Sequence, residues 1–199
     1  MAQPQKDKYE ILILPIDYNK SFLDFDKEEV QKYYQWFLNI KSDRLTHLCN
    51  FLFAKSDDCL QEINLNVIEI FLLHSVSTVP KPKEQFDAEL EKMPMHLKPY
   101  AKPDNYVLDK KTISICYDIG IFLGDLIIKL DPKIKWKLQN SDEYADYGQP
   151  ILAKKNMKFD VNPFRVAKNV ASKIYEGKYT EGQIISFFTA WKKGFKIDE

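Results

Sequence analysis

Apolar residues open the chain as one short run and then recur at helical spacing. Residues 9–16 (YEILILPI) are dominated by Ile and Leu and are too few for a stable helix. We therefore predict a strand, at a sheet edge because Pro15 lacks an amide donor. Asp26 predicts the N-cap of a helix, with Glu28 and Glu29 in the first turn, where carboxylates complement the helix dipole.

Two further capping residues predict two more helices in this half of the chain. Ser42 precedes Leu45, Leu48 and Leu52 at helical spacing, which predicts a second helix. A third is expected after a cap at Asn64 or Asn66. Together the three segments predict a small helical bundle.

Proline changes the pattern between residues 77 and 110. Half of the ten prolines fall there, which makes a continuous helix or a central strand unfavourable. One short helix is expected at residues 83–92. We interpret the stretch as a connector packed over the bundle, with a domain boundary as the alternative. Long loops in compact domains are often functional, so it is a candidate partner-contacting region.

The remaining chain predicts helices around a hairpin. A helix is expected at residues 110–129, and Gly120 and Gly124 lie four apart on one of its faces. Each costs about 1 kcal/mol relative to Ala, which predicts the close approach of another helix or a strand. Ile134, Trp136 and Leu138 alternate with lysines and predict a strand, and residues 148–153 predict a second strand pairing with it.

Two capping patterns then predict the last two helices. Asn162 and Pro163 suit an N-cap and a first helical position, with Gly177 ending that helix. Thr180 is expected to cap the final helix. The fold class is therefore α+β, predominantly α-helical, with about six helices and a small antiparallel hairpin. Residues 1–199 form one predicted domain, divided into 9–76, the connector 77–110, and 111–199.

Composition narrows the classes of function. Hydrophobic residues make up 45% of the chain and aromatic residues 14%, as in folded proteins. The 29 basic residues equal the 29 acidic ones. Because a nucleic-acid binder needs a basic excess to displace counterions, we expect no nucleic-acid partner. No apolar run is long enough to cross a bilayer, so no membrane partner is expected either.

The cysteines indicate a reducing compartment. Cys49, Cys59 and Cys116 are not clustered, so the spacing predicts neither a disulfide framework nor a zinc site. We interpret Cys49 and Cys116 as small buried side chains. The short apolar run near the N-terminus is broken by Pro15 and does not suit a signal peptide, so a cytoplasmic location is expected.

Candidate catalytic chemistry is sparse. A metal site formed by His47, Cys59 and His74 needs a loop geometry that the sequence does not specify, and no metal or other cofactor is predicted. His96 lies in the connector. No nucleophile elbow, phosphate-binding loop or dinucleotide fingerprint occurs. No catalytic residue is predicted.

Acidic and aromatic residues gather around the predicted hairpin, and three interpretations remain open. The predicted contact patch, hereafter the hairpin patch, is Trp136, Glu143, Tyr144, Asp146 and Tyr147. As a recognition surface, its rings anchor a partner and its acids steer a basic one. With Asp142 added, the acids also suit hydrolysis assisted by a histidine. The simplest interpretation is a solvated turn.

Several local motifs together resemble a protein family. They are residues 34–38, 44–48 and 64–69, then DIGIFLGD at 118–125, Lys135-Trp136, YGQPIL at 147–152 and Asn162-Pro163-Phe164. This set resembles small bacterial cytosolic proteins of unknown function, some of them immunity-like proteins of toxin loci. The resemblance covers about two thirds of the chain in pieces and skips the connector. It implies neutralisation of a protein partner, such as a toxin domain, by direct binding.

The sequence therefore predicts a non-enzymatic, protein-binding protein, with an immunity protein as its most specific form. A hydrolase of a small substrate, using Asp or Glu with His, is one alternative. A structural subunit of a larger assembly is another.

Overall fold

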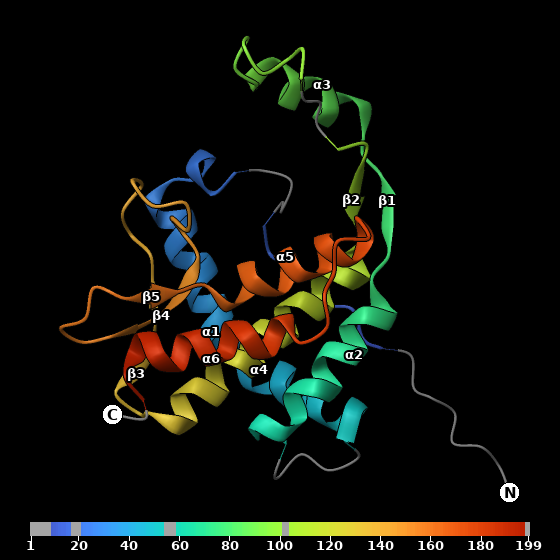
Figure 1. Ribbon diagram of the computed structural model, residues 1–199. Coiled ribbons are helices and arrows are strands. Elements are labelled where there is room, and N and C mark those ends of the chain that lie inside the picture. The colour runs from blue at the N-terminus through green and yellow to red at the C-terminus, as the bar shows by residue number, and fades with distance from the viewer. Residues whose placement is uncertain (1–8, 17–20, 54–58, 101–103, 198–199) are drawn as a thin grey trace, which may run out of the picture.

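The computed structural model describes residues 9–16, 21–53, 59–100 and 104–197, and its fold is α+β and mainly helical (Figure 1). The α-helices in these residues are α1 (Lys27–Phe53), α2 (Leu65–Ser75), α3 (Lys83–Lys92), α4 (Lys110–Leu130), α5 (Pro163–Tyr175) and α6 (Gln183–Phe195). The strands are β1 (Thr78–Pro80), β2 (Tyr106–Leu108), β3 (Ile134–Leu138), β4 (Pro150–Lys154) and β5 (Asp160–Val161). Short 3-10 helices lie at Phe22–Asp24 and Glu62–Asn64.

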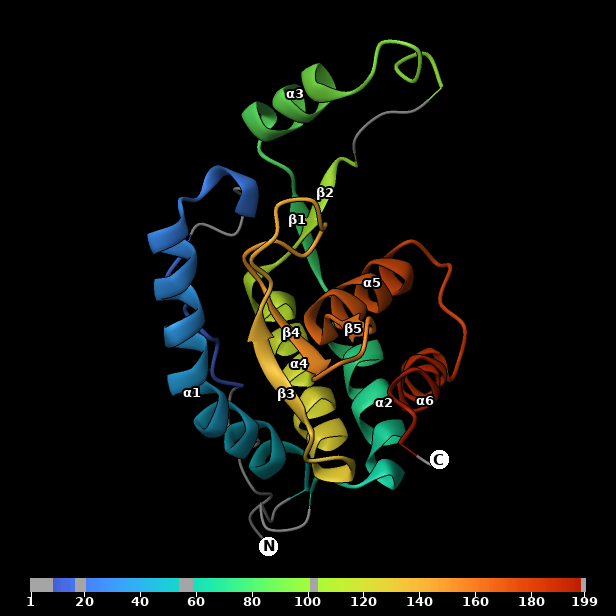
Figure 2. The ribbon, with the colours of Figure 1, turned by 90° about the vertical axis from the view of Figure 1, so that its left-hand side faces the viewer.

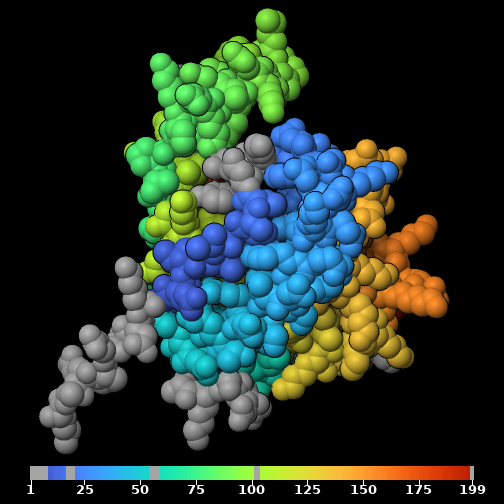
Figure 3. All heavy atoms as spheres, turned by 180° about the vertical axis from the view of Figure 1, so that it is seen from behind, coloured from blue at the N-terminus to red at the C-terminus, as the bar shows by residue number. Residues whose placement is uncertain are grey.

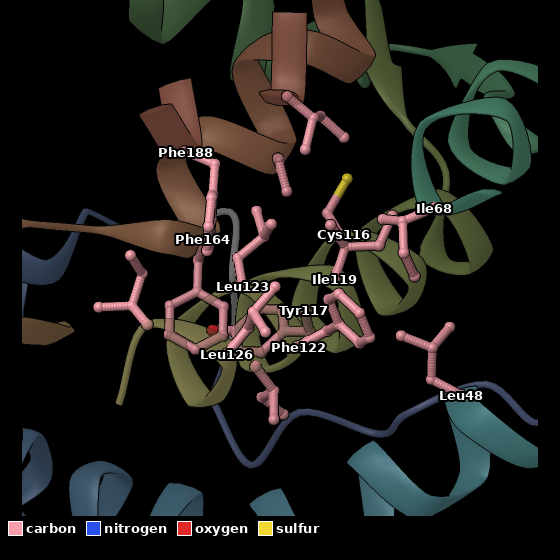
Figure 4. Packing of buried hydrophobic residues seen from close by; sticks show 14 of the residues in the cluster. Leu48, Ile68, Cys116, Tyr117, Ile119, Phe122, Leu123, Leu126, Phe164 and Phe188 are labelled. Carbon is pink, nitrogen blue, oxygen red and sulfur yellow. The ribbon is translucent and has the colours of Figure 1, made fainter. Parts of the chain in front are cut away.

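Helix α4 is the centre of the core. Fourteen of its 21 residues are buried, because α1, α2, α5 and β3 all pack on it. Figure 2 shows α1 on one side of α4, with α5, α2 and α6 on the other. Figure 4 shows the side chains of α4 between Phe188 of α6 and Leu48 of α1. These five helices, α1, α2, α4, α5 and α6, are called the helical body below.

The two glycines of α4 lie where its neighbours come closest. A Cβ on Gly120 would be only 3.1 Å from the backbone Cα of Phe164 in α5. A Cβ on Gly124 would overlap the indole of Trp136 in β3. The predicted close approach is confirmed, by a helix at the first glycine and by a strand at the second.

A single helix replaces the first two predicted helices. Asp26 caps α1, because its Oδ1 accepts from the amides of Glu28 and Glu29 at 2.8 and 2.9 Å. The prediction that Ser42 begins a new helix is wrong. Ser42 lies exposed inside α1, where the buried face continues from Phe37 on one side to Leu48 on the other. The predicted three-helix bundle is therefore one long helix and α2, both packed on α4.

Residues 9–16 do not form the predicted strand, because they belong to no helix or strand and bend at Pro15 and Ile16. Their backbone groups bind side chains instead of a neighbouring strand. Arg44 of α1 donates from Nη2 to the carbonyl of Glu10 at 2.9 Å, and the amide of Leu12 donates to Ser114 Oγ of α4 at 2.8 Å. These hydrogen bonds place the segment against α1 and α4. Figure 3 shows it in dark blue at the surface of the molecule.

A buried ion pair holds the same segment in place. Arg44 donates from Nε and Nη2 to the two carboxylate oxygens of Asp118, at 2.9 and 2.6 Å, and Tyr9 donates its hydroxyl to the same carboxylate. Burial lowers the pKa of Arg44, but Asp118 raises it above its ordinary value. Burial raises the pKa of Asp118, and the hydrogen bonds from Arg44 oppose that effect. The two-pronged contact thus ties the two residues together in the core, where removal of either partner is strongly destabilising.

The C-terminal part follows the predicted pattern with one added strand. β3 pairs antiparallel with β4, which places Trp136 opposite Leu152, and β5 pairs on the far edge of β4. Asn162 caps α5, since its Oδ1 accepts from the amide of Arg165 at 3.1 Å. The predicted cap of the last helix is wrong: α6 begins after Gly182, whose φ of 81° turns the chain without a side-chain cap.

The cysteine prediction is also wrong for one pair. Cys49 near the end of α1 forms a disulfide with Cys59, with their Cα atoms 5.8 Å apart. Cys116 is a buried free thiol, as expected. Because disulfides are rare in reducing compartments, the cysteines no longer support a cytoplasmic location, which stays a prediction.

Candidate partner-binding surface

The hairpin patch is not one continuous exposed surface, because Trp136 belongs to the core. The indole is buried, and its Nε1 donates to Asp125 Oδ1 at 2.7 Å. Its ring centroid lies 5.0 Å from that of Phe37 and 5.6 Å from that of Phe164. Trp136 is therefore not available to a partner, and its place in the patch is corrected.

Asp146 fastens the loop after β3 to the start of α5. Asn162 donates from Nδ2 to Asp146 Oδ1 at 2.9 Å, and Arg165 Nη1 lies 3.4 Å from each carboxylate oxygen. The same Asn162 side chain caps α5, so one residue couples the loop to the helix. Asp146 is thus engaged within the chain, although part of it is exposed.

Three residues of the hairpin patch remain at the surface. Glu143 and Tyr144 are exposed, and Tyr147 is half-buried. Both tyrosines line a cavity that also contains Lys168. No hydrogen bond or ion pair among the described residues joins Asp142, Glu143 or Asp146 to a histidine, so the geometry of the hydrolase alternative is not found there.

The connector forms a prominent surface feature, an arm whose described residues are 78–100 and 104–108. β1 and β2 carry it away from the helical body, with α3 and the turns after it at the far end (Figures 1 and 2). Between Leu72 and Thr112, none of the residues that the structure describes is buried. The prediction of α3 at residues 83–92 is confirmed. The two strands beside it were not predicted, because three-residue strands leave little periodicity to recognise.

Hydrogen bonds fix the base of the arm. β1 and β2 pair antiparallel from Thr78 opposite Leu108 to Pro80 opposite Tyr106. Below them, Ser77 donates its hydroxyl to Asp109 at 2.5 Å, and its amide donates to Thr112 Oγ1 at 2.9 Å.

The carboxylate of Asp109 is part of the same network. Burial raises its pKa, but hydrogen bonds from Ser77 and from the amide of Thr112 outweigh that effect and hold the pKa below its ordinary value. Asp109 therefore stays ionised at neutral pH and anchors the arm at the start of α4.

The arm has order of its own beyond the strands. Lys81 binds Glu89 of α3 with Nζ 2.6 Å from the carboxylate oxygen. Past α3, the amide of Leu97 donates to the carbonyl of Pro94 and that of Tyr100 to the carbonyl of Leu97, each at 2.9 Å. Proline and these successive turns limit the conformations of the tip and lower the entropy lost on binding.

Apolar side chains are exposed at this tip. Met95 and Tyr100 are 87% and 89% exposed, and Leu97 lies exposed between them. We call Met95, Leu97 and Tyr100 the arm tip. Met adapts to irregular surfaces and Tyr gives a large contact area at low entropic cost, so both residue types suit binding surfaces.

A shallow cavity of about 300 Å³ lies where the arm meets α5. Tyr106 of β2 and Tyr175 of α5 line it, with ring centroids 5.8 Å apart. Both rings are partly exposed, so aromatic surface continues from the arm onto the helical body.

Other site types find little support in the described part of the chain. No group of three His, Cys, Asp or Glu residues there is placed to hold a metal ion. None of its helices combines the length and the apolar character required to cross a membrane. His47, one of the residues of the metal site considered above, packs against the ring of Tyr9, 4.9 Å between centroids.

Comparisons with known proteins give no relative for this chain. No family model matches the chain, and searches of curated proteins and of solved structures find no match. The resemblance to immunity-like proteins therefore stays a prediction.

Proposed function

We propose that this chain is a protein-binding protein and that the arm provides the principal contact with its partner. One observation carries the proposal: the described residues of the arm contribute no buried residue to the core and expose apolar side chains at its end. Ordering the backbone costs about 1–2 kcal/mol per residue. Because the arm buries so little apolar surface on folding, we infer that its order serves the binding of a partner.

The arm tip fits a partner with a concave apolar surface. Met95 and Tyr100 are almost fully exposed, so a partner that covers them removes a large apolar surface from water. Truncating such anchors typically costs 2 kcal/mol or more of binding free energy, as a rough guide. We expect the variant Met95→Ser with Tyr100→Ser to weaken binding by at least about 30-fold.

Co-purification from the source cells tests the proposal. The tagged wild-type chain is expected to retain a stoichiometric partner, and Met95→Ser with Tyr100→Ser to lose it. Lys135→Ser, on the exposed side of β3, serves as a matched surface control that keeps the partner. Recovery of the wild type as a free monomer, or equal retention by both variants, would overturn the proposal.

The resemblance to immunity-like proteins gives the proposal a more specific form. In that form the partner is a toxin domain, and the arm occludes it rather than modifying it. The neighbouring open reading frame tests this form, because a multidomain toxin gene beside this one supports it. A partner without toxicity contradicts this form alone and leaves the binding function intact.

A structural subunit of a larger assembly is the second candidate, favoured by a different surface. Ile63, Val67 and Ile70 are exposed along one side of α2 and the turn before it. If these three residues form a subunit interface, the variant Ile70→Ser is expected to form a smaller assembly. The arm-tip variant is expected to keep the full size. Size measurements on the two variants therefore separate the candidates.

A further inference from the structure

A second cavity lies between the helical body and the loop that carries part of the hairpin patch. Its volume is about 270 Å³, and the described residues that line it come from α4, α5, residues 144–149, Ile16 and residues 21–23. Phe22, Tyr117, Tyr144 and Tyr147 give it aromatic walls. Among the described residues that line it, Lys168 of α5 provides the charge, and none is a carboxylate. These described residues thus combine one cation with a largely aromatic lining.

Lys168 has no counter-ion in the described part of the chain. Its Nζ lies over the ring of Tyr117, 5.6 Å from the centroid, and none of the ion pairs there includes it. Other partly buried lysines do reach a carboxylate, at 2.6–3.2 Å: Lys41, Lys81, Lys154 and Lys192. The ammonium of Lys168 therefore lies partly removed from water without the partner that such groups usually have.

The ionisable neighbour of Lys168 does not supply that charge. Burial raises the pKa of Cys116 to about 12, so its thiol is neutral at neutral pH. Burial lowers the pKa of Lys168 itself, with Cys116 acting in the opposite direction. An anion brought into the cavity would reverse this effect by stabilising the ammonium.

Hydroxyl groups of other residues that line the cavity add donors for an anion. Tyr144 and Tyr147 donate to no acceptor among the described residues, although both line the cavity. Ser21 accepts a hydrogen bond from the amide of Leu23 at 3.2 Å, which leaves its own hydrogen free to donate. A single ammonium with neutral donors matches one negative charge better than the two of a phosphate.

We propose that this cavity binds a small organic carboxylate with an aromatic or branched apolar body. The carboxylate pairs with Lys168, and the body packs against Phe22 and the tyrosine rings. The volume lies near the lower end for ligand pockets, which limits the ligand to a fragment-sized molecule. This inference uses none of the arm and stands independently of the proposed function.

Titration of the full chain with benzoate and with 4-methylpentanoate tests the proposal. NMR signals of the lysine side chains report the binding. At least one of these probes is expected to bind with a Kd on the order of 1 mM, as fragments do. Benzyl alcohol, which keeps the ring but not the charge, is expected to bind at least about tenfold more weakly. At saturation the measured pKa of Lys168 should rise.

Lys168→Met keeps the length of the side chain and removes the charge. It is expected to weaken carboxylate binding at least about tenfold. Its melting temperature should equal or exceed that of the wild type, because an unpaired, partly buried charge is removed. Lys173→Met, on the same helix but outside the cavity lining, is the matched control and should bind as the wild type does.

Three results would overturn the proposal. One is the absence of saturable binding of both carboxylates at roughly 10 mM. Another is equal binding of the carboxylates by Lys168→Met and the wild type, whatever the melting temperature of the variant. The third is equal affinity for benzyl alcohol and benzoate, which would mark the cavity as merely apolar.

Discussion

Removal of the arm should leave the helical body folded. Residues 82–104 are replaced by Asn-Gly, so that Lys81 and Asn105 flank a two-residue hairpin turn. The amide of Lys81 already donates to the carbonyl of Asn105 at 2.8 Å, as the residues flanking such a turn do. The turn therefore closes β1 and β2 without changing their register or the hydrogen bonds at the base.

The expected change in stability follows from what the arm lacks. None of its described residues is buried, so its removal leaves no cavity in the core. Shortening the connection from 23 residues to two reduces the entropy of loop closure, which stabilises the fold by about 2 kcal/mol. The ion pair between Lys81 and Glu89 is lost, but a partly exposed pair contributes little. The net free energy of unfolding should stay constant or rise by up to about 2 kcal/mol.

Urea denaturation of the two proteins measures this change. The m-value should fall only slightly, because it follows the surface exposed on unfolding and the arm buries little. A loss of more than about 2 kcal/mol would refute the reasoning, since that is the cost of emptying a core position. Such a loss would identify the arm as part of the folding unit and remove the main argument for its role in binding.

Three further predictions test the body itself. Gly124→Ala should lower the free energy of unfolding by about 2 kcal/mol, because displacing the Trp136 ring outweighs the gain in helix propensity; equal stability in urea would contradict the packing described. Cys49→Ser should cost about 3 kcal/mol for the ten-residue separation that the disulfide closes, and a reductant should lower the melting temperature of the wild type alone. Burial raises the pKa of Tyr117 from 10.0 to about 12, so its contribution to stability is complete below pH 10 and is lost as the pH rises through 12. Tyr117→Phe should flatten that decline in alkaline denaturation, and an identical decline would contradict the assignment.

Local signals in the sequence predicted most of the C-terminal part of the fold, apart from β5 and the start of α6. Alternation predicted β3 and its pairing with β4, and the Asn162-Pro163 pair predicted the start of α5, because strand pleating and capping depend on neighbouring residues. The same alternation placed Trp136 on the inner side of β3 with Ile134. The pattern thus already contradicted the assignment of Trp136 to an exposed patch.

Features that depend on distant residues were not predictable. Ser42 has the chemistry of a cap, but whether a helix continues past it depends on packing against α4. Residues 9–16 have the composition of a strand, yet Arg44 and Ser114 bind their backbone from two separate helices. The disulfide depends on where Cys59 lies relative to the end of α1, which no local pattern specifies.

The candidate site was predictable only in outline. The prolines indicated that residues 77–110 differ from the rest of the chain, and the short helix within them was recognised. Nothing in the local pattern shows whether such a segment packs over a core or stands away from it. The exposure of Met95 and Tyr100 is therefore visible only in the fold.

Site-specific photo-crosslinking in the source cells tests the central claim most directly. A photoreactive residue replaces Tyr100 at the arm tip or, as a control, Lys135 on the exposed side of β3. Binding through the arm predicts one dominant adduct of defined mass from position 100 and none from position 135. Equal adducts from both positions, or none from position 100 while position 135 reacts, would contradict it.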